Sequence, residues 1–219
     1  LAASAALASR KGLGADLIYL PEIPFDLDKF ASDVSAVCER NDGKCIVVVA
    51  EGLKTAGGMY VGDFRPVSTD HFGHAALGGL AGMLGEVIKN RLNVKVRPIE
   101  LSLMQRCGAH LASQVDVDEA FQAGVEAVRA AVAGETDKMV VFNRDYTKDE
   151  YVCTPSLVHL EVSANAERTV PLEWITENGT GISDEFVKYA LPLIQGEVTI
   201  PHEDGLPRFA KLKKIYAQK

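Results

Sequence analysis

Several features that would point to particular classes of protein are missing from this sequence. It has no CxxC pair among its four cysteines, which stand at positions 38, 45, 107 and 153, so neither a zinc ribbon nor a dithiol redox site is indicated. It has no apolar run long enough to cross a bilayer. It has no excess of positive charge, because the net charge is −7 and the isoelectric point about 5.3. Membrane insertion is therefore not predicted, and neither is non-specific nucleic-acid binding, which needs a basic surface.

Motifs that carry catalysis are also scarce. There is no Walker sequence, no nucleophile beside a general base and no pair of catalytic carboxylates. His71 and His74 have a spacing that could bind a metal, but no third ligand is evident, and they more readily open the helix that follows. Asn178 begins a glycosylation sequon, which a cytoplasmic chain would not use. We expect a cytoplasmic chain, because isolated cysteines in an acidic, enzyme-sized sequence are typical of reduced core thiols.

The sequence does contain a regular alternation of apolar runs and amphipathic stretches. Short apolar or β-branched runs predict strands, and stretches with apolar residues at helical spacing predict helices. Strands are expected over 16–20, 45–50, 94–101, 138–142 and 157–162, helices over 1–12, 27–38, 74–91, 116–132 and 184–194, and a loop over 52–70. The alternation predicts an α/β fold with a largely parallel sheet.

A carboxylate stands where a ligand is expected in such a fold. Glu51 directly follows the strand predicted over 45–50, and ligands of open α/β sheets bind at the carboxyl ends of the strands. Its side chain could accept hydrogen bonds from sugar hydroxyls. It could equally be a loop residue that faces water, and its position alone does not decide between the two.

Two arginines flank the end of the strand predicted over 94–101. The guanidinium groups of Arg97 and Arg106 could together hold a phosphoryl group, because the planar fork donates two parallel charge-assisted hydrogen bonds. Alternatively, Arg97 is a surface residue of the strand and Arg106 pairs with a carboxylate, and spacing alone favours this second interpretation. Taken by themselves, the residues predict an α/β protein with a candidate anion site.

Longer stretches of the sequence resemble a known family. The segments ADLIYLPE (15–22), VVVAEG (47–52), DHFGHAALGG (70–79) and KVRPIELSLMQRCGAHLASQVDVDEAFQAGVEAV (95–128) resemble the phosphofructokinases. The segments YALPLIQGE (189–197) and DGLPRFAKLKK (204–214) are similar to the C-terminal end of the pyrophosphate-dependent bacterial branch of that family. The resemblance covers nearly the whole chain, and its most specific parts are 95–128 and the two C-terminal segments.

The resemblance implies a parallel-sheet, three-layer α/β domain of the phosphofructokinase type, in an enzyme whose active site lies between two similar domains. It implies that residues 1–105 form a sugar-phosphate-binding domain that lacks its start. Residues 106–155 would return to pack on the phosphoryl-donor domain, and residues 156–219 would form a C-terminal extension. Most of the N-terminal donor domain is expected to be missing from this sequence.

The same resemblance implies a reaction and roles for named residues. The reaction is the reversible, magnesium-dependent transfer of a phosphoryl group from pyrophosphate to fructose 6-phosphate in glycolysis, carried out by a homo-oligomer. Glu51 matches the glutamate that binds the sugar, and the Gln105–Arg106 pair matches the site of the 6-phosphate. Arg97 matches an arginine that reaches this phosphate from a neighbouring subunit. Leu103 stands where the family often has His or Tyr, so only its backbone is expected to line the pocket.

No catalytic residue or metal ligand is assigned to this chain. The glycine-rich donor loop, the catalytic aspartates, the MGR motif and the magnesium ligands of the family are all expected upstream of Leu1, so residues 1–219 alone are expected to be inactive. The sequence would then be a piece of an enzyme. The alternative is a non-catalytic regulatory subunit that binds a sugar phosphate. Pyrophosphate is favoured over ATP as the donor because of the two C-terminal segments.

Overall fold

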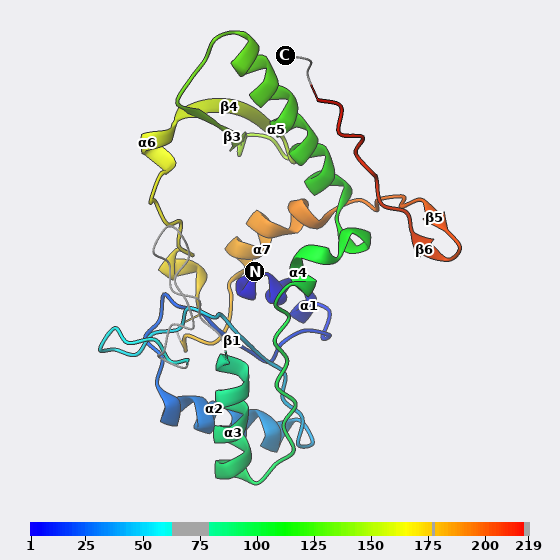
Figure 1. Ribbon diagram of the computed structural model, residues 1–219. Coiled ribbons are helices and arrows are strands. Elements are labelled where there is room, and N and C mark those ends of the chain that lie inside the picture. Colours follow the sequence, from blue (N-terminus) through cyan, green and yellow to red (C-terminus); the bar gives the residue numbers. More distant parts are fainter. Residues whose placement is uncertain (63–78, 177, 217–219) are drawn as a thin grey trace. The chain divides into compact units, whose positions relative to one another are not determined.

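The computed structural model describes residues 1–62, 79–176 and 178–216 (Figure 1). The chain divides into two compact units. The first combines Leu1–Ser102 with Asn165–Leu191, and the second combines Leu103–Ala164 with Pro192–Lys219. The separate roles expected for residues 1–105, 106–155 and 156–219 stay a prediction.

The first unit is built on two short parallel strands. β1 (Leu17–Tyr19) pairs with β2 (Val47–Val49) in the register Leu17 to Val47 and Tyr19 to Val49. Both strands lie within the ranges predicted from their apolar runs. The Ile18 amide donates to the Thr180 carbonyl at 2.9 Å, so a segment from far along the chain returns to β1.

Helices cover both faces of this strand pair. Leu17 and Tyr19 belong to one hydrophobic cluster with α2 (Leu27–Arg40) and α3 (Leu80–Leu92). Ile18 and Leu20 belong to a second cluster with η1 (Ala2–Ala5), α1 (Ala6–Ser9), η3 (Leu172–Trp174) and α7 (Asp184–Ala190). Successive strand residues point to opposite faces, so the two clusters make the first unit a three-layer α/β structure, as predicted.

The prediction of a strand over 94–101 is wrong. Among the residues that the structure describes, this segment is extended but is not hydrogen-bonded to another strand. Val94 and Val96 pack against the first cluster while Lys95 and Arg97 are exposed. The alternating pattern thus reports burial of one face, whereas a strand also needs a partner for its amides.

Several expectations fall on residues 63–78, which lie outside the described residues. These are the last part of the loop predicted over 52–70, from residue 63 on, the start of the helix predicted from His74, and the histidine pair His71 and His74. As described, α3 begins at Leu80 after Gly79, whose φ of +80° lies in the left-handed region that favours glycine.

The second unit consists of a long helix and an antiparallel hairpin. α5 (Gln114–Val132) packs against β3 (Lys138–Arg144) and β4 (Cys153–His159), whose register runs from Lys138 opposite His159 to Arg144 opposite Cys153. The parallel arrangement is therefore confirmed for β1 and β2, while β3 and β4 are antiparallel. The strand predicted over 157–162 corresponds to β4, which begins and ends earlier than expected. The remaining short elements are α4 (Met104–Cys107), η2 (Ala109–Leu111), α6 (Leu160–Ser163), η4 (Leu191–Ile194), β5 (His202–Glu203) and β6 (Leu206–Pro207).

Helix α5 begins two residues before the Asp116 start that its capping pattern predicted. Ser113 is the N-cap residue, and its hydroxyl accepts a hydrogen bond from the Asp116 amide at 3.1 Å. The same hydroxyl donates to the Leu193 carbonyl at 2.6 Å. Asp116 thus lies in the first turn, where its negative charge is favourable near the helix N-terminus.

No helix in the described part of the chain has both the length and the apolar character needed to cross a bilayer.

Replacing Ser113 by alanine is expected to destabilise the start of α5 by about 1–2 kcal/mol, because both the cap and the bond to Leu193 are lost. Amide hydrogen exchange in the first turn of α5 would measure this. Ser32→Ala is the matched control, because Ser32 is exposed on α2. Unchanged exchange at Asp116 in the Ser113 variant would contradict the capping role.

Candidate functional site

Glu51 lies at the carboxyl end of the strand pair, where the sequence predicted it. It is the second residue after β2, its side chain is exposed, and within the described residues it makes no hydrogen bond or ion pair. The loop that follows is fixed at Leu53, which is 0 % exposed and whose carbonyl accepts from the Val61 amide at 2.9 Å. The backbone around Glu51 is therefore held in place while its carboxylate is left available.

A second carboxylate at the same edge has a structural role that the sequence did not reveal. Glu22 follows β1, and its Oε1 accepts from the Val170 amide at 2.8 Å. Its Oε2 is buried and has no hydrogen-bond partner in the described part of the chain. This contact joins segments 148 residues apart, so no local sequence pattern could have indicated it.

Arg97 is held outward by its neighbours. A Cβ added to Gly85 of α3 would lie 3.4 Å from both Val96 and Pro98, which shows that these two side chains pack closely on that helix. Arg97, between them in the extended segment, is exposed. It makes no ion pair or hydrogen bond with any described residue. The interpretation of Arg97 as a surface residue fits its exposure, although it is not part of a strand.

Leu103, Gln105 and Arg106 belong to the second unit, at the short helix α4. Leu103 is the N-cap residue without a side-chain cap, and its carbonyl accepts from the Arg106 amide at 2.9 Å. All three side chains are exposed, with Leu103 at 69 %. The alternative interpretation, in which Arg106 pairs with a carboxylate, is not found within the described residues. Its guanidinium is available to a ligand.

The structure thus places the five predicted site residues in two groups. Glu51 and Arg97 lie in the first unit, and Leu103, Gln105 and Arg106 lie within four positions of one another in the second. Leu103 and Arg106 are three residues apart, which puts them on the same side of the helical turn. Within each unit these polar groups are exposed and carry no competing ion pair among the residues described.

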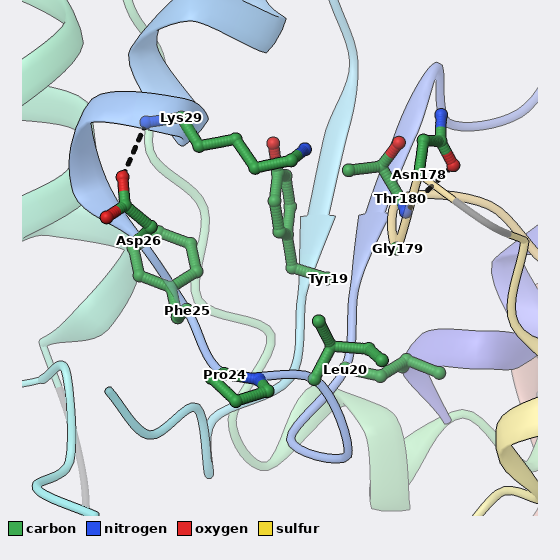
Figure 2. Close-up of a pocket in the computed structure, with 10 residues that line it drawn as sticks. Tyr19, Leu20, Pro24, Phe25, Asp26, Lys29, Asn178, Gly179 and Thr180 are labelled. Carbon is green, nitrogen blue, oxygen red and sulfur yellow. Dashed lines mark hydrogen bonds between the residues drawn. The ribbon is translucent and has the colours of Figure 1, made fainter. Parts of the chain in front are cut away.

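A small cavity in the first unit is lined by none of these residues. It has a volume of about 20 Å³, roughly the room that one water molecule needs, and Figure 2 shows Lys29 reaching toward Tyr19 with Asn178 and Thr180 across from it. Burial, and then a hydrogen bond to Asp33 at 2.9 Å, raise the pKa of Tyr19. A cavity of this size cannot hold a hexose phosphate, and none of the five residues lines it.

A wider, open hollow of about 650 Å³ lies near the start of β1. Its lining residues again include none of the five; they are Asp16, Leu17, Arg40, Thr176, Asn178, Thr180 and Gly181. No cluster of three or more His, Cys, Asp or Glu side chains in the described ranges is arranged to hold a metal ion. The expectation that magnesium ligands lie elsewhere stays a prediction.

Comparison with known proteins decides the family. Residues 1–151 match the family described as phosphofructokinase. This chain belongs to the phosphofructokinase family. It is 38% identical, over 98% of its length, to a pyrophosphate--fructose 6-phosphate 1-phosphotransferase of Halomonas elongata, and 36% identical, over 97%, to the protein of that name from Methylococcus capsulatus. These matches cover 50% and 51% of the relatives, so the chain spans about half their length.

Other similarities complete the comparison. An ATP-dependent 6-phosphofructokinase of Mycobacterium leprae is 37% identical over 62% of this phosphofructokinase chain and 38% of its own. The crystal structure of a pyrophosphate-dependent phosphofructokinase from Nitrosospira multiformis has a TM-score of 0.82 and 32% identity, covering 100% of this chain and 50% of that one. The corresponding Marinobacter aquaeolei structure has a TM-score of 0.75 and 35% identity, covering 93% and 46%. The predicted phosphofructokinase-type α/β fold is confirmed.

Proposed function

We propose that this chain is the sugar-phosphate-binding part of an enzyme that transfers a phosphoryl group from pyrophosphate to fructose 6-phosphate. The observation that carries the proposal is the exposed Arg106, which lacks an ion pair within the described residues. By resemblance, the Gln105–Arg106 pair matches the 6-phosphate site of the family. An arginine already engaged by a carboxylate would have to break that pair before it could bind phosphate.

The proposed roles follow from the charge of the ligand. The 6-phosphate is a dianion, and the guanidinium groups of Arg106 and Arg97 offer paired, charge-assisted donors to it. Gln105 and the backbone of Leu103 would line the same pocket, and Glu51 would accept hydrogen bonds from the sugar hydroxyls. Because the 6-phosphate is not the reacting group, its binding energy serves to position the 1-hydroxyl for attack. Arg97 would act across the interface of a homo-oligomer.

Pyrophosphate is the proposed donor because relatives named for it match nearly the whole chain, whereas the ATP-dependent ones match 62% to 64% of it. Magnesium would neutralise charge on the donor. The described residues include no cluster suited to it, so no step of the reaction is assigned to the metal here. We further propose that the enzyme acts in cytoplasmic glycolysis.

A chimeric enzyme tests the proposal. Residues 1–219 would be joined to the half of the Halomonas elongata relative that they do not match, and turnover would be followed in a coupled assay. We expect magnesium-dependent turnover with pyrophosphate and fructose 6-phosphate, less with ATP, and none from residues 1–219 or the donor half alone. A folded chimera that binds fructose 6-phosphate without turnover would instead support the non-catalytic regulatory subunit.

A further inference from the structure

The chain between β1 and α2 forms a closed loop within the first unit. We call residues 19–25, from the last residue of β1 to the residue before the N-cap of α2, the connecting loop. The side chains at its two ends are in contact, because the ring centroids of Tyr19 and Phe25 lie 5.4 Å apart (Figure 2). Both rings are buried in the hydrophobic cluster shared by β1, α2 and α3. The core therefore fixes the ends of the loop, and other contacts must hold the residues between them.

The connecting loop runs alongside Glu51. The Ala50 amide, directly before Glu51, donates to the Tyr19 carbonyl at 3.0 Å. Directly after Glu51, a Cβ added to Gly52 would lie 4.0 Å from Pro21 Cγ, so these two residues are neighbours. The backbone on both sides of Glu51 thus lies against the loop, and a displacement of the loop would move the Glu51 carboxylate with it.

A further contact joins the loop to the chain that follows Glu51. The Phe25 amide donates to the Lys54 carbonyl at 2.8 Å, and the neighbouring Leu53 is fully buried. Residues 50–54 are therefore hydrogen-bonded to the connecting loop at both of their ends, with Glu51 between the two bonds. The position of the Glu51 backbone is set by the loop.

Glu22 attaches the connecting loop to a distant part of the chain. Its Oε1 accepts from the Val170 amide at 2.8 Å, and Val170 belongs to residues 165–191, the second stretch of the first unit. Its Oε2 is buried without a hydrogen-bond partner among the residues that the structure describes. A buried oxygen without a partner costs free energy, and such exceptions are typical of functional sites. Stability alone therefore does not account for a glutamate at this position.

We propose that Glu22 is a positioning residue for sugar binding. Through its bond to Val170 it fixes the connecting loop, and the loop fixes the Glu51 carboxylate toward the sugar hydroxyls. The inference rests on the proposed function, in which Glu51 accepts hydrogen bonds from those hydroxyls. It gives the sugar site a contribution from Val170, which lies beyond the residues 1–151 that match the family. Glu22 acts through Glu51 and need not touch the substrate.

Substitutions at both ends of the bond test the proposal in the chimera described above. Glu22→Ala removes the acceptor, and Val170→Pro removes the amide hydrogen. Each should raise the KM for fructose 6-phosphate about fivefold, because a loosened carboxylate must be ordered when the sugar binds. The kcat and the KM for pyrophosphate should stay unchanged. Glu22→Gln should recover most of the loss, since its amide oxygen can still accept from Val170. Glu173→Gln is the matched control, because Glu173 is exposed in the same stretch of the first unit.

A double-mutant cycle separates positioning from a general loss of stability. If Glu22 acts through Glu51, Glu22→Ala should add nothing to the KM of a Glu51→Ala chimera, because the group that it positions is already absent. A merely structural role predicts that the two effects multiply. Hydrogen exchange at the Ala50 amide should rise in Glu22→Ala, while exchange in the middle of α3 should stay unchanged.

An unchanged KM for fructose 6-phosphate in both Glu22→Ala and Val170→Pro would overturn the proposal, and so would effects that multiply in the cycle. If these changes prevent folding, Glu22→Asp carries the same test, because it keeps the carboxylate and shortens its reach by one methylene. If the chimera binds fructose 6-phosphate without turnover, the Kd from calorimetry replaces the KM in every comparison. A chimera that does not bind it at all would refute the proposed function and this inference with it, whereas binding that is insensitive to Glu22 would refute this inference alone.

Discussion

Leu53→Ala is expected to lower the free energy of unfolding of the first unit by about 2–5 kcal/mol. Leu53 is 0 % exposed and belongs to the hydrophobic cluster shared by β1, α2 and α3. Truncation removes apolar contacts and leaves a cavity that the neighbouring side chains fill only in part. The carbonyl that accepts from the Val61 amide is retained, so the loss comes from packing and not from a broken hydrogen bond.

Trp174 provides the measurement. It is the only tryptophan of the chain, and its ring centroid lies 6.1 Å from that of Phe186 in the same unit. Its fluorescence in a urea titration therefore follows unfolding of the first unit. Leu13→Ala is the control, because Leu13 is 80 % exposed and a change of no more than about 0.5 kcal/mol is expected there. Equal midpoints for the two variants would show that Leu53 does not anchor this core.

Arg106→Ala is expected to raise the KM for fructose 6-phosphate by about ten- to a hundredfold in the chimeric enzyme. A charge-assisted hydrogen bond to the phosphate contributes about 1.5–3 kcal/mol, and each 1.4 kcal/mol is a factor of ten. Arg106→Lys should recover only part of the loss, because an ammonium keeps the charge but not the planar fork. The KM for pyrophosphate should hardly change, since the donor is expected to bind to the other domain.

Steady-state kinetics with each substrate varied in turn would measure these effects. Arg97→Ala should act similarly but depend on enzyme concentration if the residue works across a subunit interface, and changes at Glu51 should affect affinity less. Arg10→Ala is the matched control, because Arg10 is exposed at the end of α1. A higher KM for pyrophosphate with an unchanged KM for fructose 6-phosphate would place Arg106 in the wrong half of the site.

The sequence predicted elements whose signals are local. The β-branched run before Glu51 gave β2, the apolar period after Asp26 gave α2, and the family-specific segment over 95–128 indicated the family that the comparisons confirm. Such signals are readable because a helix or a buried strand records its own periodicity in consecutive residues. The position of Glu51 just after the second strand was likewise predicted correctly, and the roles of Glu51 and Arg106 stay proposals.

Two features were predicted incorrectly, a strand over 94–101 and the first residue of α5. The segment over 94–101 alternates like a strand, yet it finds no strand to bond with among the described residues. Helix α5 begins two residues early because the Ser113 hydroxyl caps it while donating to Leu193, 80 positions away. A strand needs an amide partner, which the local pattern does not specify. The cap itself is a local bond to an amide three residues on, whereas the bond from Ser113 to Leu193 could not be read from neighbouring residues.

The sequence by itself determined the α/β class, because hydrophobic periodicity is a property of consecutive residues. The resemblance of whole segments to a known family indicated the family and the candidate ligand residues. The tertiary structure alone decided which of those residues remain available. It shows that Arg97 and Arg106 carry no ion pair within the described residues, and that the Glu22 carboxylate accepts a hydrogen bond from the Val170 amide. These facts depend on contacts between residues distant in sequence, and only folding brings such residues together.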